Sequence, residues 1–376
     1  MQIQAAVLDK MGVAAPYAQS RPLAIRTLEL APPGPDEVLI KVAAAGLCHS
    51  DLSVINGDRP RPMPMALGHE GTGIVEALGP DVAGLREGDR VVLVFLPSCG
   101  RCAPCLSGEG YLCETGAAAN GKGELIGGGF RLHEHVGDHG HDVHHHLGVS
   151  AFSTHVVVDQ RSTVKVDAAI PAEIAAVFGC AVLTGVGAAI NSAKIVAGET
   201  VIVFGLGGVG LAALMGAVAS GASRVIGVDR VPAKVALAQE LGAIGTTPEG
   251  LSDAIAAHLP SSGADVVIET VGNARVLAAA YGAARRGGRI VTVGLPPPDQ
   301  RLDLAALSLV AEGKTLIGSY MGSAIPARDI PRYVAMWQAG RLPVERLISS
   351  THRLEELNAM LDAMDRGEAI RQIIRF

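Results

Sequence analysis

The stretch VIVFGLGGVGLAALMGAVASGASRVIGVD, residues 201–229, decides the fold of this chain. Its first residues, Val201–Phe204, are all β-branched or aromatic, which predicts a buried strand. Three glycines in G-x-G-x-x-G spacing then predict a tight turn, and a largely apolar helical segment follows. A second strand, Val225–Val228, leads to Asp229. Strand, turn, helix and strand in this order predict a βαβ unit.

The glycine turn has the composition of a dinucleotide-binding site. Gly205 allows the tight turn, Gly207 lets the backbone approach a pyrophosphate, and Gly210 lets the helix pack on the sheet. The helix N-terminus offers N–H groups and a partial positive charge to phosphates. Asp229 follows Gly210 by 19 residues, where a carboxylate can reach a ribose hydroxyl. We therefore predict that the chain binds a dinucleotide.

The composition is that of a globular protein with more than one domain. The chain has 376 residues, of which 49% are hydrophobic and 18% are charged. At about 150 residues per domain this length predicts two or three domains, and the apolar content excludes a disordered chain. The net charge of −6 at pH 7 and the scattered Lys and Arg argue against a nucleic-acid partner.

Two uncharged segments, Ile174–Ala193 and Val201–Ser223, are long enough to cross a membrane. Both are rich in Gly and Ala, and the second contains the glycine turn. We therefore interpret them as buried α/β elements and expect no membrane partner. The first residues show no basic segment followed by an apolar core, so we expect no secretory signal and a cytoplasmic protein.

The rest of the chain predicts two kinds of structure. The N-terminal part has short strand patterns between Pro-rich turns, with strands at Glu37–Ala45 and Val91–Phe95. From Pro171–Phe178 onward, helices alternate with strands, which predicts a doubly wound parallel sheet. Beyond Asp229 we expect helices at Pro232–Leu241, Asn273–Ala284, Ile330–Gly340 and Leu354–Asp365, strands at Ala264–Glu269, Arg289–Gly294 and Thr315–Ser319, and a final strand within 366–376.

Four of the six cysteines lie in one short loop, with C-x2-C-x2-C-x7-C spacing: Cys99, Cys102, Cys105 and Cys113. Four thiolates this close together match a closed tetrahedral zinc site. Disulfides fit poorly in a large chain without a secretory signal. The spacing also lacks the proline that follows the last Cys in bacterial iron–sulfur motifs. We predict a structural zinc site.

The two remaining cysteines, Cys48 and Cys180, form a second candidate set with His69. Each of these residues alone is typical of a buried side chain without a ligand. Together, and in a chain with a dinucleotide site, they make a Cys, His, Cys set with one open position. That set matches the catalytic zinc of an alcohol dehydrogenase.

Over essentially its whole length the sequence resembles the zinc-dependent medium-chain alcohol dehydrogenases. The matching motifs are GLCHSD at 46–51, GHEGTG at 68–73, the cysteine quartet, GCAVLTG at 179–185, GLGGVG at 205–210 and Asp229. The resemblance implies an α/β fold, with a doubly wound parallel Rossmann sheet inserted in a mainly-β GroES-like catalytic domain. It implies a catalytic domain at 1–181 with the structural-zinc loop at 97–115, a Rossmann domain at 182–320, and a return to the catalytic domain at 321–376.

The resemblance implies a reaction: hydride transfer between a primary alcohol and NAD, with two zinc ions per chain. Cys48, His69 and Cys180 would hold the catalytic zinc. Ser50 would take the alcohol proton, and Asp51 would orient His69, as metal-bound His usually requires.

The resemblance also implies the cofactor contacts. Glu70 would lie behind the zinc near Arg371, and His49 and Arg371 would contact the pyrophosphate. Asp229 would favour NAD over NADP, because a 2′-phosphate would meet its carboxylate. The nicotinamide ring would be held by Thr184, Val209 and Val293. The implied cofactor contacts are His49, Thr184, Gly205, Gly207, Gly208, Val209, Gly210, Asp229, Arg230, Lys234, Val271, Val293, Gly294, Leu295 and Arg371.

One position departs from the family. Where some members end the proton path on a histidine, this chain has Ser53, so the relay needs water, another base or His49. By resemblance the substrate pocket is formed by Ser50, Arg59, Phe95, His146 and Leu147. A largely apolar pocket suggests a hydrophobic primary alcohol, either aromatic or terpenoid.

Seven histidines lie between His133 and His146, and Gly137, Asp138 and Gly140 are interspersed among them. Dense histidine can bind transition metals, but we interpret this stretch as a solvated loop.

Two other functions are compatible with parts of the sequence. One is a thiol-dependent formaldehyde dehydrogenase of the same family. The other is a non-catalytic NAD(H)-binding regulator, which need not keep Cys48, His69 and Cys180 together. The family forms homodimers and homotetramers through the cofactor domains, commonly by a strand such as Thr315–Tyr320.

Overall fold

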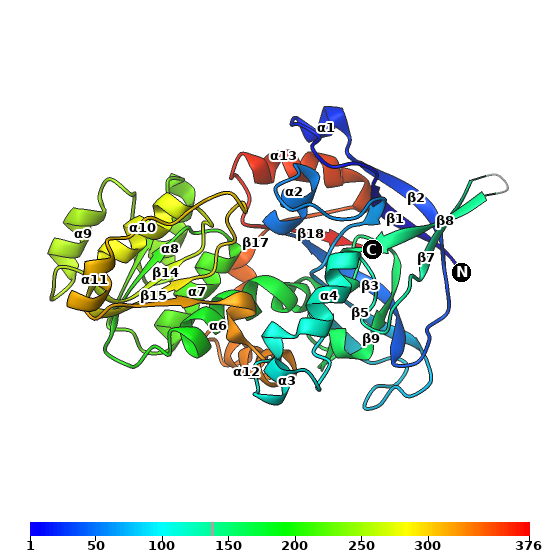
Figure 1. Cartoon of the computed structure of the whole chain (residues 1–376), viewed down its shortest axis with the longest axis horizontal. Helices are drawn as coiled ribbons and strands as arrows, with labels where there is room; N and C mark the ends of the chain where they lie inside the picture. The colour runs from blue at the N-terminus through cyan, green and yellow to red at the C-terminus, as the bar shows by residue number, and fades with distance from the viewer. Residues whose placement is uncertain (137–138) are drawn as a thin grey trace. The chain divides into compact units, whose positions relative to one another are not determined.

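The computed structural model describes residues 1–136 and 139–376, so Gly137 and Asp138 lie outside the described residues. The chain forms two compact units (Figure 1). The first contains Met1–Cys180, Ile325–Pro331 and Ile348–Phe376, and the second contains Ala181–Ala324 and Arg332–Leu347. Ala181 and residues 321–324 and 332–347, which the sequence analysis placed with the catalytic domain, belong to the second unit.

The first unit is mainly β. A closed barrel has the strand order β1 (Gln2–Leu8), β2 (Leu23–Leu30), β7 (Leu132–Val136), β8 (His139–His145) and β4 (Met65–Ala66). A sheet has the order β10 (Thr163–Val166), β6 (Arg90–Leu93), β5 (Gly71–Leu78), β3 (Glu37–Leu47), β18 (Arg371–Arg375) and β17 (Ile348–His352), and β9 (His155–Asp159) also pairs with β3. Its helices are α1 (Tyr17–Ser20), α2 (His49–Ile55), α3 (Ala103–Leu106), α4 (Glu114–Lys122), α5 (Ala172–Val177) and α13 (Leu357–Asp365).

Strand β3 is the central element of this unit. It pairs with β5, β9 and β18, and its register joins Gln372 to Leu47. Leu47 and Ile40 are fully buried in a core that also contains Phe152 and Leu361. Because β3 ends where α2 begins, this buried strand fixes the position of the residues that follow Leu47.

The second unit is a parallel α/β sheet. Its strand order is β13 (Ile244–Thr246), β12 (Arg224–Val228), β11 (Thr200–Phe204), β14 (Ala264–Glu269), β15 (Ala284–Thr292) and β16 (Thr315–Gly318). The helices are α6 (Leu183–Gly187), α7 (Gly208–Ala219), α8 (Pro232–Glu240), α9 (Leu251–His258), α10 (Ala274–Ala283) and α11 (Ala306–Ala311). If these six strands are numbered along the chain, their order across the sheet is 3-2-1-4-5-6, which is the Rossmann arrangement. The predicted fold class is confirmed; α12 (Pro326–Gln338) begins in the first unit and ends in the second, and the chain returns to the first unit at Ile348.

The apolar stretch 172–192 is one continuous helical segment. It is long and apolar enough to span a membrane, but 89% of its most apolar window is buried inside the protein. It contains two π-helical turns, Phe178–Val182 and Ala188–Ser192. Helix α7 accounts for much of the other uncharged segment, and most of its residues are buried. Both segments are therefore core elements, as predicted from their Gly and Ala content.

The prediction for the His-rich stretch is wrong. Residues 132–136 and 139–145 form two antiparallel strands of the closed barrel, in which β7 pairs with β2 and β8 pairs with β4. Alternation explains the difference, because Leu132 and Val143 lie in the barrel core, whereas His135 and Asp142, on the opposite face of their strands, are exposed. Polar side chains of the two strands also pair with each other: His133 Nδ1 lies 2.8 Å from Asp142 Oδ1. The dense histidine hid a strand pattern of period two.

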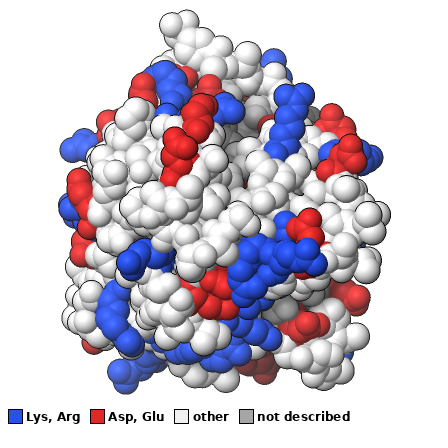
Figure 2. Space-filling model, turned by 90° about the vertical axis from the view of Figure 1, so that its left-hand side faces the viewer, with Lys and Arg blue, Asp and Glu red and all other residues white. Residues whose placement is uncertain are grey.

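Charge is balanced locally. Ion pairs such as Arg285–Asp265 and Arg289–Glu199 neutralise part of the basic charge of the second unit. On the molecular face drawn in Figure 2, acidic side chains lie among the basic ones.

Candidate active site

Two sulfur atoms and one ring nitrogen of the first unit lie close together. The ligand atoms of Cys48, His69 and Cys180 all lie within 4.8 Å of one another. The two sulfurs are 4.0 Å apart, and Cys180 Sγ is 3.6 Å from His69 Nε2. Two ligand atoms on a tetrahedral zinc ion lie about 3.4–3.8 Å apart, so this set fits the ion. The exposed fractions are 5%, 1% and 6%, so the site is shielded from bulk water.

Each ligand follows or interrupts a rigid element. Cys48 is the N-cap of α2, directly after β3, and His69 lies between β4 and β5. Cys180 lies in the π-helical turn Phe178–Val182. A Cβ on Gly179 would approach the Leu93 carbonyl oxygen to 2.1 Å, so only glycine lets this helix come so close to β6. That close approach brings Cys180 to the other two ligands.

Asp51 holds the His69 ring. Its Oδ1 is 3.0 Å from His69 Nδ1, and its Oδ2 accepts the Cys48 N–H at 3.0 Å. Burial alone would raise the pKa of Asp51, but His69 and His146 outweigh it and lower that pKa to about 2. Burial lowers the pKa of His69, yet Asp51 raises it to about 10 in the metal-free chain. A cation at Nε2 would take the place of that proton, while Asp51 keeps the Nδ1–H tautomer.

Two of the predicted pocket residues lie against His69. The rings of Phe95 and His146 contact the His69 ring edge to face, at centroid distances of 5.6 and 5.2 Å. His146 Nδ1 is 3.2 Å from Asp51 Oδ1, and burial lowers the pKa of His146. Leu147 is 7% exposed. The Ser150 hydroxyl, which the sequence analysis missed, accepts the His146 N–H and donates to the Ala66 carbonyl.

Glu70 and Arg371 form a buried pair beside the sulfurs, with 3.3 Å between Glu70 Oε1 and Arg371 Nε. Burial raises the pKa of Glu70 to about 7, against the opposing charge of Arg371. Burial would lower the pKa of Arg371, but Glu70 raises it. Arg371 also donates to the Leu47 carbonyl, so it braces the turn before Cys48.

Ser50 and Ser53 have different environments on α2. Arg59 Nη1 donates to Ser50 Oγ at 3.1 Å. The Ser53 hydroxyl donates to the His49 carbonyl at 3.0 Å, and Ser53 is 5% exposed. Ser53 is therefore bound to its own helix, whereas the His49 side chain is exposed.

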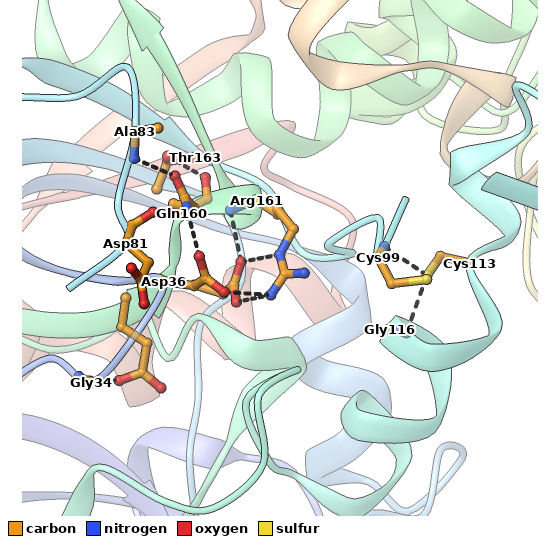
Figure 3. A network of polar contacts seen from close by, with 12 residues as sticks. Gly34, Asp36, Asp81, Ala83, Cys99, Cys113, Gly116, Gln160, Arg161 and Thr163 are labelled. Atoms are coloured by element: carbon orange, nitrogen blue, oxygen red, sulfur yellow. Dashed lines mark hydrogen bonds and ion pairs between the residues drawn. The ribbon is translucent and has the colours of Figure 1, made fainter. Parts of the chain in front are cut away.

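The cysteine quartet also converges. Its four sulfurs lie within 4.8 Å of one another, and all four cysteines are free. Figure 3 shows Cys113 Sγ accepting the N–H groups of Cys99 and Gly116, at 3.2 and 3.3 Å. The Thr115 hydroxyl and the Arg101 N–H lower the pKa of Cys99 to about 5. N–H donors that stabilise thiolates suit a metal better than a disulfide, so the quartet fits zinc.

The glycine turn lies in the second unit. Gly205 has a φ of 84°, and a Cβ on Gly210 would approach the Gly205 carbonyl oxygen to 1.7 Å. Among the described residues, no atom beyond the chain neighbours lies within 4 Å of a Cβ built on Gly207, the N-cap of α7, so the backbone is open to close approach at this position. Asp229 accepts the N–H groups of Leu206 and Val231 at 2.7 and 2.9 Å. The turn and the carboxylate fit a pyrophosphate and a ribose.

Two family models match the chain: the alcohol dehydrogenase GroES-like domain at residues 34–168 and the zinc-binding dehydrogenase domain at residues 208–339. A geraniol dehydrogenase from Castellaniella defragrans is 39% identical over 99% of this chain and 97% of its own length. The chain belongs to the zinc-dependent medium-chain alcohol dehydrogenases.

Solved structures of the family are similar throughout. A benzyl alcohol dehydrogenase from Acinetobacter calcoaceticus has a TM-score of 0.90 and 33% identity, covering 100% of this chain and 99% of that one. A zinc-binding-domain alcohol dehydrogenase from Burkholderia ambifaria has a TM-score of 0.91 and 34% identity, with the same coverage.

In this family member the expected cofactor contacts are divided between the units. His49 and Arg371 belong to the first unit. The second unit contains the others: Thr184, Gly205, Gly207, Gly208, Val209, Gly210, Asp229, Arg230, Lys234, Val271, Val293, Gly294 and Leu295. Val271 and Leu295 are 52% and 50% exposed, at the carboxyl ends of β14 and β15.

The sequence analysis missed the residues that hold these loops. Glu269 is 1% exposed, and it accepts the N–H groups of Val271 and Gly272 and the Thr292 hydroxyl. The Thr270 hydroxyl contacts the Phe204 and Gly205 carbonyls. The sequence signal for these residues was an acidic residue at the end of a buried strand, Glu269, followed by a hydroxyl residue, Thr270. They lie at the sheet edge where Rossmann proteins bind ligands.

Proposed function

We propose that this family member is an NAD-dependent alcohol dehydrogenase that interconverts a hydrophobic primary alcohol and its aldehyde. The observation that supports this proposal most strongly is the buried set Cys48, His69 and Cys180. Three protein ligands leave one position of a tetrahedral ion for substrate, whereas a structural site is closed. The relatives named geraniol and benzyl alcohol dehydrogenases support the substrate class.

Zinc held by Cys48, His69 and Cys180 would act as a Lewis acid that favours the alkoxide form of an alcohol and polarises an aldehyde carbonyl. NAD would supply the hydride chemistry. The protein supplies two things around these groups. Asp51 fixes the His69 ring through Nδ1, and the rings of Phe95 and His146 pack against it in a site where His69 is 1% exposed.

Ser50 would accept the alcohol proton at Oγ, because it is the partly exposed hydroxyl two residues after Cys48. Ser53 is a poor next carrier, since its hydroxyl is bound to the His49 carbonyl. The proton would pass from Ser50 to water. The substrate pocket would be bounded by Phe95, His146 and Leu147, with Arg59 at its polar side.

NAD would bind at the glycine turn, with its pyrophosphate at the N-terminus of α7 and Asp229 on the adenosine ribose. Open space at Gly207 supports the phosphate position. Thr184, Val209 and Val293 would face the nicotinamide ring, and His49 and Arg371 would face the pyrophosphate.

The quartet Cys99, Cys102, Cys105 and Cys113 would hold a second, structural zinc. A homo-oligomer through the cofactor domains is supported by apolar exposure on the second unit. Val310 of α11 is 82% exposed, and Leu316 of the edge strand β16 is 37% exposed. We also propose a cytoplasmic location.

Steady-state kinetics with a panel of alcohols tests this function. NADH formation from benzyl, cinnamyl and terpenoid primary alcohols should exceed that from ethanol in kcat/KM. Formaldehyde oxidation that needs an added thiol and exceeds all of these would replace the proposal with the thiol-dependent activity. NADH formation from none of them would contradict an enzymatic role.

A further inference from the structure

Arg59 is fixed at both ends to the helix that carries Ser50. Its backbone N–H donates to the Ser53 carbonyl at 2.8 Å, at the end of α2. The turn before it is closed by the Asn56 side chain, which accepts the Asp58 N–H at 3.0 Å. From this anchored backbone the guanidinium returns to Ser50 and donates to Oγ at 3.1 Å. The two residues therefore form one rigid unit.

We propose that Arg59 is a positioning residue that orients the Ser50 hydroxyl for proton transfer from the alcohol. The inference rests on the proposed function, and it goes beyond placing Arg59 at the pocket. Arg59 acts through Ser50 and takes no proton itself, because a guanidinium stays protonated in proteins.

A serine hydroxyl has one donor and two acceptor sites. The Arg59 N–H occupies one acceptor site, and it also prevents the Ser50 O–H from pointing in that direction. One lone pair remains for the alcohol, and the O–H must point elsewhere. When the alcohol O–H bond breaks, its proton binds that lone pair, and the Ser50 proton passes to a water molecule. The proton count balances without another residue.

The charge on Arg59 strengthens this arrangement. Hydrogen bonds with an ionised donor are roughly twice as strong as neutral ones. A charged donor makes Oγ a weaker base and its O–H a stronger acid, so it disfavours a doubly protonated Ser50 and favours transfer in which the Ser50 proton leaves as the alcohol proton arrives. In a chain with Ser53 instead of a relay histidine, the orientation of Ser50 replaces part of the missing path.

A double-mutant cycle tests the inference. The variants are Arg59→Met, Ser50→Ala and their combination, and the readout is the rate constant of NADH formation in the first turnover at saturating alcohol. Arg59→Met should lower this rate constant at least about tenfold. The KM for the alcohol should change by less than about threefold in either direction. In the Ser50→Ala background the same change should cost less than about twofold, because Arg59 acts through Ser50. Arg59→Lys, which keeps a charged donor, should recover most of the loss.

Arg61→Met is the matched control. Arg61 donates to the Asn120 carbonyl at 3.5 Å, so its effect should be the same with and without Ser50. Thermal unfolding and fluorescence titration with NADH show whether each variant is folded and binds cofactor. Equal losses from Arg59→Met in both backgrounds, or no recovery with lysine, would overturn this inference and leave the proposed function standing. Undiminished transfer in Ser50→Ala would overturn the proposed role of Ser50 and this inference with it.

Discussion

At the scale of single residues, one carboxylate organises the candidate catalytic centre. Asp51 Oδ1 faces His69 and His146, and its Oδ2 accepts the Cys48 N–H. It therefore fixes two of the three candidate zinc ligands, one through its ring and one through its backbone. Asp51 is fully buried, so the charge depends on these partners for its stability.

Asp51→Asn should weaken zinc binding at this centre about 10–100-fold, because it removes the anion that orients the His69 ring. Competition with a chelator, followed by the amount of zinc retained per chain, measures the change. Asp58→Asn is the matched control, since Asp58 is exposed and pairs with Asn56. Zinc retention equal to that of the parent in Asp51→Asn would show that Asp51 does not orient a ligand.

Asp229 should set the cofactor preference. We expect kcat/KM with NAD to exceed that with NADP at least about tenfold, or roughly 1.4 kcal/mol, because a 2′-phosphate would approach the carboxylate. Asp229→Gly should reduce or invert the ratio, since exposed Arg230 would then lack a neighbouring carboxylate. Equal use of both cofactors by the parent would place Asp229 away from the ribose.

At the scale of elements, the amino ends of β11 and β14 are joined by Asp265. It accepts the N–H and hydroxyl of Thr200 at 2.8 and 2.6 Å, and Arg285 Nε at 2.6 Å. Burial alone would raise the pKa of Asp265, but the Thr200 and Arg285 donors hold it below its ordinary value of 3.8. A lowered pKa stabilises the fold above the unfolded pKa, and this contribution is lost as the pH falls through the folded pKa.

Asp265→Asn should therefore destabilise the protein at pH 7 by about 1–3 kcal/mol. The difference from the parent should begin to shrink below about pH 4, where the carboxylate is protonated in the unfolded state, and should be smallest below the folded pKa, where it is protonated in both states. Urea unfolding across this pH range measures it. Asp299→Asn, at an exposed position, should show no such trend. A pH-independent difference for Asp265→Asn would mean that its charge contributes nothing.

What the sequence predicts depends on how local each signal is. The glycine turn and the cysteine quartet are each encoded within a short segment. The structure forms the turn, and it brings the four sulfurs of the quartet together, as expected. Barrel strands β7 and β8 depend on pairing with β2 and β4, and their histidines obscured the alternation. The Arg59–Ser50 contact and the Ser150 brace on His146 depend on side-chain packing that spacing does not encode.

At the scale of the whole molecule, the first unit is assembled from distant parts of the chain. Strand β18 pairs with β3, and this pairing brings Arg371 to Leu47 across 324 residues. Cys180 comes to His69 across 111 residues. The second unit has sequential βα connections instead. The candidate metal centre therefore forms only when segments of the first unit that lie far apart in the sequence have packed together, and its integrity reports on the native fold of that unit.

The most direct test of the account counts zinc and measures turnover on the same samples of the parent, His69→Ala and Cys102→Ser. The account predicts two zinc ions per chain in the parent, which oxidises a hydrophobic primary alcohol with NAD. His69→Ala should keep one zinc and remain folded but lose turnover. Cys102→Ser should lose the other zinc and unfold at a lower temperature, because structural zinc contributes folding free energy. Full turnover in His69→Ala, or two zinc ions in each variant with unchanged stability, would contradict the account.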